Sequence, residues 1–316
     1  MVQQSNPNDR FLQMPVVLSE VMRVMEPELA FIDIIPMVDS GGQPVMYATK
    51  ASASSDTKKQ TPRIRTPSSR FPEVQVTRIT KATALTLQEG LSIRLDEAAL
   101  RLPAGADMIA QSLQDIGYWL AEYVNTEIYT TIRAGGTDAG MTPTAVWSSS
   151  SATPMLDLRT FKNAMKREGY PYRMTDMYAH MTSLNELEEF LSGTEIPAYR
   201  DAAMAGTSQG LVLPMEGKPL FHGMFSGITD GHLLGLDRNH KGAASVFYYN
   251  DPQYSVPSVD YQTVVDGKPV QRNVPNFGLS MYKYFEDDTH DTIIQLWMDH
   301  VTVVKDAYGI LYDTGL

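Results

Sequence analysis

The stretch ATKASASSDTKKQTPRIRTPSSRFPEV (residues 48–74) decides how this chain is interpreted. Between residues 51 and 70 its only apolar side chains, prolines apart, are Ala51, Ala53 and Ile64. Such a segment buries too little surface to offset the entropy of ordering it within its own domain. Strand-like sequence flanks it on both sides, which is typical of the tip of a long arm. An arm that leaves a compact body usually holds a neighbouring molecule, so the stretch favours assembly over catalysis.

The same stretch is basic in an acidic chain. Residues 48–74 hold six basic and two acidic side chains, a net +4, whereas the whole chain carries −11, so the remainder carries −15. A basic arm is complementary to an acidic body, and therefore to another copy of the chain. We predict inter-subunit contacts by the basic side chains of this segment, namely Lys50, Lys58, Lys59, Arg63, Arg65 and Arg70. A solvated charge-rich loop is the alternative. Nucleic-acid binding as the main role is disfavoured, because the acidic body would repel phosphates.

Length and composition exclude several classes of protein and of functional site. A chain of 316 residues is long enough for two domains or one elaborated domain. The absence of cysteine excludes disulfides, thiolate metal sites and thiol nucleophiles. No apolar run is long enough to cross a bilayer, and the N-terminus lacks the pattern of a secretory signal. No glycine-rich phosphate-binding motif occurs, so we predict no cofactor.

Outward from the arm tip, Gln43–Thr49 predicts an outgoing strand and Glu73–Leu87 a returning strand. Both strands are polar on both faces, so this ribbon has little core of its own. The strongest helix signal follows at Asp107–Arg133, with Tyr123 and Ile132 widening an apolar stripe of helical spacing that consists of Ile109, Leu113, Ile116, Leu120, Val124 and Ile128. With one apolar face, this helix should pack on something broad, such as a sheet.

Weaker signals mark the other elements. A short helix is expected at Leu18–Met25, with Ser19 as its cap and Pro27 as its end. Further helices are expected at Asp157–Glu168 and at Ser183–Leu191, where Ser183 and Glu186 would form a capping box. The remaining strands are expected at Tyr172–His180, Leu211–Pro214, His232–Leu236 and Ser245–Asn250, then an irregular Pro/Tyr segment, and last a long hairpin of Leu279–Phe285 and Thr292–Val304.

Two patterns carry candidate chemistry, and each has a plainer explanation. Gly206–Gly210 matches the G-x-S-x-G nucleophile elbow with Ser208, but that elbow needs a buried strand before it and a helix after it, and neither context is present. The cluster Asp287, Asp288, His290 and Asp291 has metal-binding residue types, but acidic residues are common in such a hairpin turn. The other five histidines lack the spacing of a catalytic metal site. We therefore predict no catalytic residue and no metal ligand.

The order of elements resembles the major capsid proteins of tailed double-stranded-DNA viruses, which have the Hong Kong 97-like fold. LSEVMRVMEPELAFIDIIP (residues 18–36) resembles the N-terminal arm of that family, residues 43–87 its extended loop, and Asp107–Arg133 its spine helix. The fold class implied is α+β. The domains implied are an N-terminal arm, an extended loop, a peripheral domain with the spine helix, an axial domain and a peripheral β-hairpin, at residues 1–37, 38–88, 89–140, 141–275 and 276–316.

The resemblance implies a structural protein that is not an enzyme. Its subunits would form hexamers and pentamers that close into an icosahedral shell around packaged double-stranded DNA, held without sequence specificity. Scaffolding, portal and decoration proteins would be further partners, and no membrane would be involved. The protein would reside in the virion, after assembly in the host cytoplasm. The alternatives are an encapsulin-type nanocompartment shell of the same fold and, from another class, a soluble serine hydrolase using Ser208.

Overall fold

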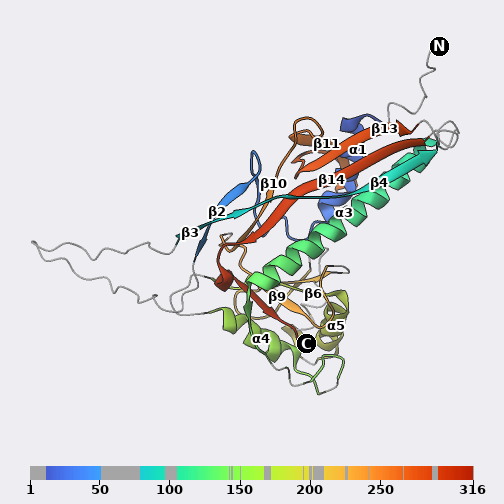
Figure 1. Ribbon diagram of the computed structural model, residues 1–316. Coiled ribbons are helices and arrows are strands. Elements are labelled where there is room, and N and C mark those ends of the chain that lie inside the picture. Colours follow the sequence, from blue (N-terminus) through green and yellow to red (C-terminus); the bar gives the residue numbers. More distant parts are fainter. Residues whose placement is uncertain are drawn as a thin grey trace, which may run out of the picture. The chain divides into compact units, whose positions relative to one another are not determined.

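The computed structural model describes residues 12–50, 79–96, 105–141, 143, 145–149, 151–166, 172–194, 196–198, 201, 210–224, 227–240, 242–265, 267–286 and 291–315 (Figure 1). Its described residues fall into two compact units. Unit 1 takes residues from Met1–Val45, Ala84–Thr130 and Val246–Val303, and unit 2 from Met46–Thr83, Thr131–Ser245 and Val304–Leu316. The five-part division of the chain stays a prediction. No helix in the described ranges is both long enough and apolar enough to span a membrane.

A five-stranded sheet forms the centre of unit 1. Its strands are β1 (Met37–Asp39), β10 (Ala244–Tyr248), β14 (Asp291–Val304) and β13 (Leu279–Glu286) in that order, with β4 (Leu87–Asp96) paired to β14. β13 and β14 are antiparallel, with Leu279 opposite Met298 and Glu286 opposite Asp291, which confirms the predicted C-terminal hairpin. Side chains alternate between the faces of a strand. The even-numbered residues of β14 from Ile294 to Thr302 are all buried, so this face lies toward the core.

The long helix α3 (Gly105–Gly135) confirms the predicted helix at Asp107–Arg133. All six residues of the predicted apolar stripe, and Ile132, are 3% exposed or less. Tyr123 does not widen this stripe as predicted, because the residue is 46% exposed. One apolar face thus supplies the burial that stabilises the helix.

Helix α1 (Met14–Glu28) is longer than the short helix predicted from residues 18 to 25. Pro27 lies inside it and does not end it. Ser19 is not its cap, since its hydroxyl donates to the carbonyl of Asp260 at 2.8 Å. The helix ends where the buried Asn125 side chain donates to the Glu28 carbonyl at 2.7 Å and accepts from the Ala30 amide at 3.1 Å. A distant side chain therefore satisfies the terminal backbone groups.

A two-stranded hairpin of β11 (Ser258–Val265) and β12 (Lys268–Pro275) occupies the segment that was expected to be irregular. That expectation was wrong. The two residues between the strands are Asp266-Gly267, a dipeptide that strongly favours a two-residue hairpin turn. Gly267 has a φ of +74°, which a glycine adopts without strain. The turn dipeptide, with the alternating residues before it, is the signal that could have revealed this hairpin.

Unit 2 is built on a six-stranded mixed sheet with the order β5-β15-β9-β6-β8-β7. β6 pairs in parallel with β8 and antiparallel with β9. The sheet strands are β5 (Thr137–Asp138), β15 (Ile310–Asp313), β9 (Leu233–Leu236), β6 (Asp176–His180), β8 (Leu220–Met224) and β7 (Leu211–Val212). Helices α4 (Pro154–Met165) and α5 (Met181–Gly193), the short 3-10 helix η2 (Ala307–Gly309) and the two-stranded pair β2 (Val45–Lys50) and β3 (Ile79–Ala84) complete it.

The two helices expected in this region are present, but the capping box predicted for the second is not. Helix α5 begins two residues before Ser183, which is buried inside the helix. Its N-cap is His180, whose Nδ1 accepts from the Thr182 amide at 3.3 Å. A spacing that satisfies the capping rule is therefore not sufficient when a better-placed acceptor precedes it.

Asp176 at the start of β6 is the most deeply buried charge in the described part of unit 2, with its side chain 0% exposed. Its two oxygens accept hydrogen bonds from Arg238 at 2.6 and 3.2 Å, from His222 at 2.9 Å and from Thr175 at 2.8 Å. Burial alone would raise the pKa of this carboxyl, but the hydrogen bonds outweigh burial and hold the pKa of Asp176 below its ordinary value. The carboxylate therefore stabilises the sheet in its ionised form.

Candidate assembly surfaces

Of the predicted inter-subunit side chains, the structure places only the backbone of Lys50, at the end of β2. The other five, Lys58, Lys59, Arg63, Arg65 and Arg70, lie outside the described residues, and so does the arm tip. Their contacts with a neighbouring subunit stay a prediction. The strands expected on either side of the tip are present as β2 and β3, which pair with each other.

The structure does not support the alternative of a serine hydrolase with a nucleophile elbow at Ser208. Ser208 lies outside the described residues, but the residues directly after the pattern do not form a helix. Leu211 and Val212 form strand β7, paired antiparallel with β8. A nucleophile elbow needs a helix after the serine, because the helix N-terminus stabilises the developing oxyanion. The prediction that no helix follows the G-x-S-x-G pattern is thus confirmed.

The acidic turn is described only at its ends. Asp287, Asp288 and His290 lie outside the described residues. Asp291 forms an ion pair with Arg94 of β4 at 3.0 Å, and Arg94 also pairs with Glu286 at 2.9 Å. The carboxylates at both ends of the turn are therefore compensated by an arginine. A metal ion at this turn stays an untested hypothesis.

Three exposed leucines lie along β4 and directly before it, namely Leu85, Leu87 and Leu91, and we call this group the β4 edge. β4 pairs with β14 along its whole length, from Leu87 opposite His300 to Asp96 opposite Asp291. Within the described residues, no strand pairs with its other side. All three leucines are exposed, Leu87 to 54%. An exposed apolar edge strand is an aggregation hazard in a monomer unless another chain covers it.

A row of aromatic side chains forms a second exposed surface of unit 1. Tyr282 and Tyr284 of β13 are exposed on one face of the strand, and the exposed Phe285 projects from the other face. The rings of Tyr282 and Tyr284 stack at 5.7 Å, and Tyr254 meets Tyr282 edge-on at 5.8 Å. Contacts between rings fix this row before any partner binds, which lowers the entropy lost on association. Tyrosines arranged in this way are typical of protein–protein interfaces.

The β11–β12 hairpin is anchored at its base and exposed beyond it. Tyr261 is only 4% exposed, and its hydroxyl donates to Glu26 of α1 at 2.8 Å. Burial, and next this hydrogen bond, raise the pKa of Tyr261 to about 12. Arg272 of β12 donates to the same carboxylate at 3.2 Å. Toward the turn both strands are exposed, with Val264 at 68%, and a ribbon of this kind is marginal in water without a partner.

The outer side of α3 adds a fourth apolar set, consisting of Tyr118 and Trp119, with Trp119 at 56% exposure. Scattered apolar residues are normal on a monomer, but several separate sets on one compact unit are not. Aromatic residues with a polar end are also the ones enriched where proteins meet. The four sets on unit 1 are therefore best explained as surfaces that other chains cover.

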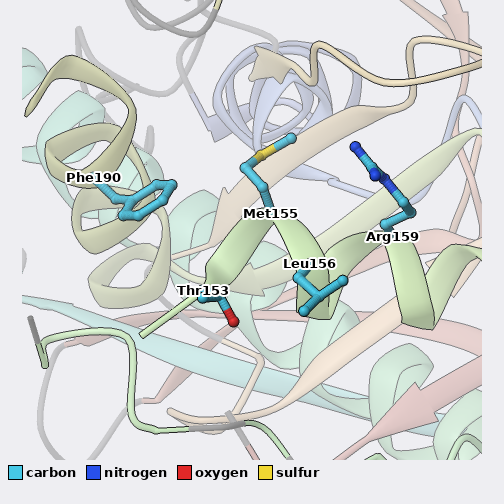
Figure 2. Close-up of a pocket in the computed structure, with 5 residues that line it drawn as sticks. All are labelled: Thr153, Met155, Leu156, Arg159 and Phe190. Atoms are coloured by element: carbon cyan, nitrogen blue, oxygen red, sulfur yellow. The ribbon is translucent and has the colours of Figure 1, made fainter. Parts of the chain in front are cut away.

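No catalytic arrangement accompanies the hollow of about 240 Å³ beside α4 in unit 2 (Figure 2). Its lining consists of Thr153, Met155, Leu156, Arg159 and Phe190. These residues offer one hydroxyl and one guanidinium, and no carboxylate or imidazole that could act as a general acid or base. The hollow is also smaller than typical ligand pockets.

No protein-family model matches this chain. No curated protein sequence matches it either. Many solved structures are similar in fold, and three of them are described here. The virus-like particle from Pyrococcus furiosus has a TM-score of 0.56 at 10% identity, covering 94% of this chain and 97% of that one. The mature capsid of bacteriophage PhiM1 has a TM-score of 0.53 at 11% identity, covering 90% and 86%. The SrpI encapsulin of Synechococcus elongatus has a TM-score of 0.51 at 10% identity, covering 92% and 88%. The chain therefore has the α+β, Hong Kong 97-like fold that the order of elements predicted.

Proposed function

We propose that this protein is the major capsid protein of a tailed double-stranded-DNA virus, a structural subunit that assembles into an icosahedral shell and is not an enzyme. The observation that carries the proposal is the likeness in fold, over about nine-tenths of both chains, to proteins named as virus-like particle and phage capsid. Many modest contacts per subunit add up in a closed shell, because each contact is repeated at every symmetry-related position.

The exposed surfaces of unit 1 support self-assembly. The β4 edge, the aromatic row, the β11–β12 hairpin and the outer side of α3 together present apolar groups on four elements. Apolar area removed from water contributes roughly 25 cal/mol per Å². A stable interface of standard size buries on the order of 1,600 Å². Surfaces on several elements allow one subunit to contact several neighbours, as a closed shell of hexamers and pentamers requires.

Charge supports a contact between copies of the chain. The segment 48–74 carries +4 and the rest of the chain −15. Lys50, Lys58, Lys59, Arg63, Arg65 and Arg70 would lie on an acidic surface of the adjacent subunit. The acidic remainder would limit sticking to the packaged double-stranded DNA, which the shell encloses without reading its sequence. Scaffolding, portal and decoration proteins are expected partners, and assembly would take place in the host cytoplasm before the subunit resides in the virion.

An encapsulin-type nanocompartment is the second candidate, because one structure of similar fold is named as an encapsulin. The two candidates share the shell and differ in its contents. Particles from the cells that produce the protein should contain nuclease-protected double-stranded DNA if it is a capsid. Protein cargo without DNA would favour the nanocompartment.

Electron microscopy of the purified, recombinant chain tests the shell itself. We expect closed particles of uniform diameter. Chains that remain monomeric at high concentration, over a range of salt and pH, would contradict the proposal. Leu85→Lys should reduce the particle yield at least ~10-fold, because it places a charge at the most exposed leucine of the β4 edge, away from the strand residues that face His300. Ser92→Lys is the control, since Ser92 of β4 is exposed on the face opposite Leu87 and Leu91.

A further inference from the structure

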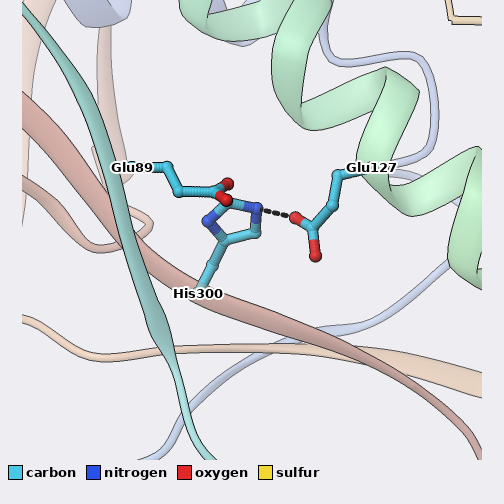
Figure 3. A group of neighbouring side chains, drawn as sticks. All are labelled: Glu89, Glu127 and His300. Carbon is cyan, nitrogen blue, oxygen red and sulfur yellow. Dashed lines mark ion pairs between the residues drawn. The ribbon is translucent and has the colours of Figure 1, made fainter.

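Three titratable side chains from three elements of unit 1 converge at one point (Figure 3). Glu89 comes from β4, Glu127 from α3 and His300 from β14. Glu89 lies opposite Met298 in the β4–β14 ladder, and His300 is two residues further along β14. Because side chains alternate between faces, Glu89 and His300 project from the same face of the sheet. One carboxylate oxygen of each glutamate and one ring nitrogen of the histidine lie within 4.8 Å of one another.

The converging atoms are buried, and their hydrogen-bonding capacity is not met within the protein. His300 is 1% exposed, and neither of its ring nitrogens has a hydrogen-bond partner. The same holds for Oε2 of Glu89 and Oε2 of Glu127. Glu127 and His300 form an ion pair, drawn as a dashed line in Figure 3, without the alignment of a hydrogen bond. Buried polar atoms are nearly always satisfied, so a group of them facing one another points to a missing ligand.

Unsatisfied atoms are also concentrated in this region. Eight described residues carry buried side-chain nitrogen or oxygen atoms without a hydrogen-bond partner. Three of the eight form this cluster, and Thr302 of β14 projects from the same face of the sheet as His300, whereas Asp299 projects from the opposite face. Leaving such groups unpaired costs about 1–3 kcal/mol each, and more when the group is charged. A compact unit would not carry this cost at one place without compensation.

The charges of the cluster identify the kind of ligand. Two carboxylates and one imidazole carry a charge of −2 when the ring is neutral. A divalent cation compensates both and uses the neutral ring as a ligand. Imidazole nitrogen suits zinc and related transition metals better than calcium or magnesium, which take oxygen ligands.

We propose that Glu89, Glu127 and His300 form a binding site for one divalent transition-metal ion, with Zn²⁺ the best fit. Nitrogen and carboxylate ligands lie about 2.0–2.2 Å from Zn²⁺, so tetrahedral ligands are about 3.4 Å apart. Donor atoms that already lie within 4.8 Å of one another reach this spacing by small rotations of the two glutamate side chains. Three protein ligands leave a fourth position for water.

A neighbouring hydroxyl holds one ligand in place. Tyr123 of α3 hydrogen-bonds to Glu89 through its hydroxyl. The hydroxyl leaves the other carboxylate oxygen of Glu89 able to bind the ion. Hydrogen bonds to metal ligands orient them and are part of most metal sites.

The site would act as a metal cross-link within unit 1. It would tie β4, α3 and β14 to one another through a single ion, in addition to the ladder between the two strands. β4 follows β3, the returning strand beyond the predicted arm, so the ion would fix the strand to which the arm leads. A metal ion bound only in the folded state adds its binding free energy to stability. The inference does not depend on the shell function.

Metal binding by the full-length chain tests the site. The protein is stripped with a chelator, dialysed and titrated with Zn²⁺ by calorimetry, and the Co²⁺ form is examined by visible absorption. We expect one tight equivalent per chain, the absorption of a four-coordinate Co²⁺ ion, and a higher Tm with Zn²⁺ than without. Glu89→Gln, Glu127→Gln and His300→Gln should each weaken binding at least ~10-fold, since losing even a group that only orients a ligand costs that much.

Glu122→Gln is the matched control, because Glu122 is exposed on the same helix and outside the cluster. Its affinity for Zn²⁺ should equal that of the unmodified protein. If the histidine variant does not fold, the two nearly isosteric glutamine variants still decide the question. Absence of a tight equivalent in the unmodified protein would overturn the proposal. Unchanged affinity in Glu89→Gln and Glu127→Gln would do so as well, because the ion would then be bound elsewhere, for example at the acidic turn.

Discussion

Gly90 is the residue of β4 at which the least change should have the largest effect. It lies opposite Trp297 in the β4–β14 ladder. A Cβ atom at this position would lie 2.1 Å from the carbonyl oxygen of Leu296 and 2.5 Å from the Cβ of Trp297. Gly90 is not among the glycines with a positive φ, so alanine is compatible with the backbone and the clash is the whole effect of Gly90→Ala.

The size of the destabilisation follows from the distance between the added Cβ atom and the Leu296 carbonyl oxygen. An ordinary contact begins at 3.4 Å, so the strands must separate locally by about 1.3 Å. A ladder hydrogen bond lengthened by that amount, from about 2.9 Å to about 4.2 Å, no longer counts as one. Loss of two such bonds costs about 1–3 kcal/mol, which equals the usual cost of overpacking. For a domain of about 150–250 residues this corresponds to a Tm lower by roughly 2–12 °C.

Thermal unfolding of the purified subunit and hydrogen exchange of residues 79–96 provide the measurement. Gly90→Ala should lower the Tm and speed exchange in β4. Gly42→Ala is the control in the same unit, since its added Cβ meets nothing within 4 Å, and it should be neutral or stabilise by about 0.4–1 kcal/mol. Equal Tm and equal exchange for the two variants would refute the idea that β4 is held this closely to β14.

Three further changes test other parts of the molecule. Charge reversal of Arg63, Arg65 and Arg70 to Glu should leave the subunit folded and lower the yield of particles, as high salt should for the unmodified chain; a normal yield in electron micrographs would exclude an electrostatic role of the arm. Asn125→Ala should cost about 2–4 kcal/mol in chemical unfolding, because it strands two backbone groups at the end of α1; a loss below ~0.5 kcal/mol would mean that water replaces the side chain. Asp176→Asn should cost about 1.5–3 kcal/mol at pH 7. Since the pKa of Asp176 is lowered by folding, its contribution is present above about pH 4 and is lost as pH falls through the lower, folded-state value, so the two proteins should converge in acid; a gap that widens in acid would contradict this sign.

Local patterns predicted some elements well and others poorly. The stripe from Ile109 to Ile128 predicted α3 because a single helical period sustained over more than five turns leaves no other conformation that buries those residues. The prediction that Ser19 caps the helix was wrong because its hydroxyl donates to the carbonyl oxygen of Asp260, 241 positions further along the chain. The capping box predicted at Ser183 was wrong because the helix begins earlier, with the His180 side chain accepting a hydrogen bond from the Thr182 amide. The metal cluster gave no signal, since Glu89, Glu127 and His300 are separated by 38 and 173 residues.

Local sequence was sufficient to predict the order of the main elements except the β11–β12 hairpin, the long amphipathic helix, the C-terminal hairpin and a basic, apolar-poor segment in an acidic chain. These features depend on the spacing of neighbouring residues or on composition, which can be read along the chain. The folded chain was needed to show which distant residues meet: that β4 pairs with β14, that apolar residues stay exposed beside that pairing, and that two glutamates and a histidine converge. Strand pairing and helix packing are contacts between residues far apart in the chain, and no local period encodes them.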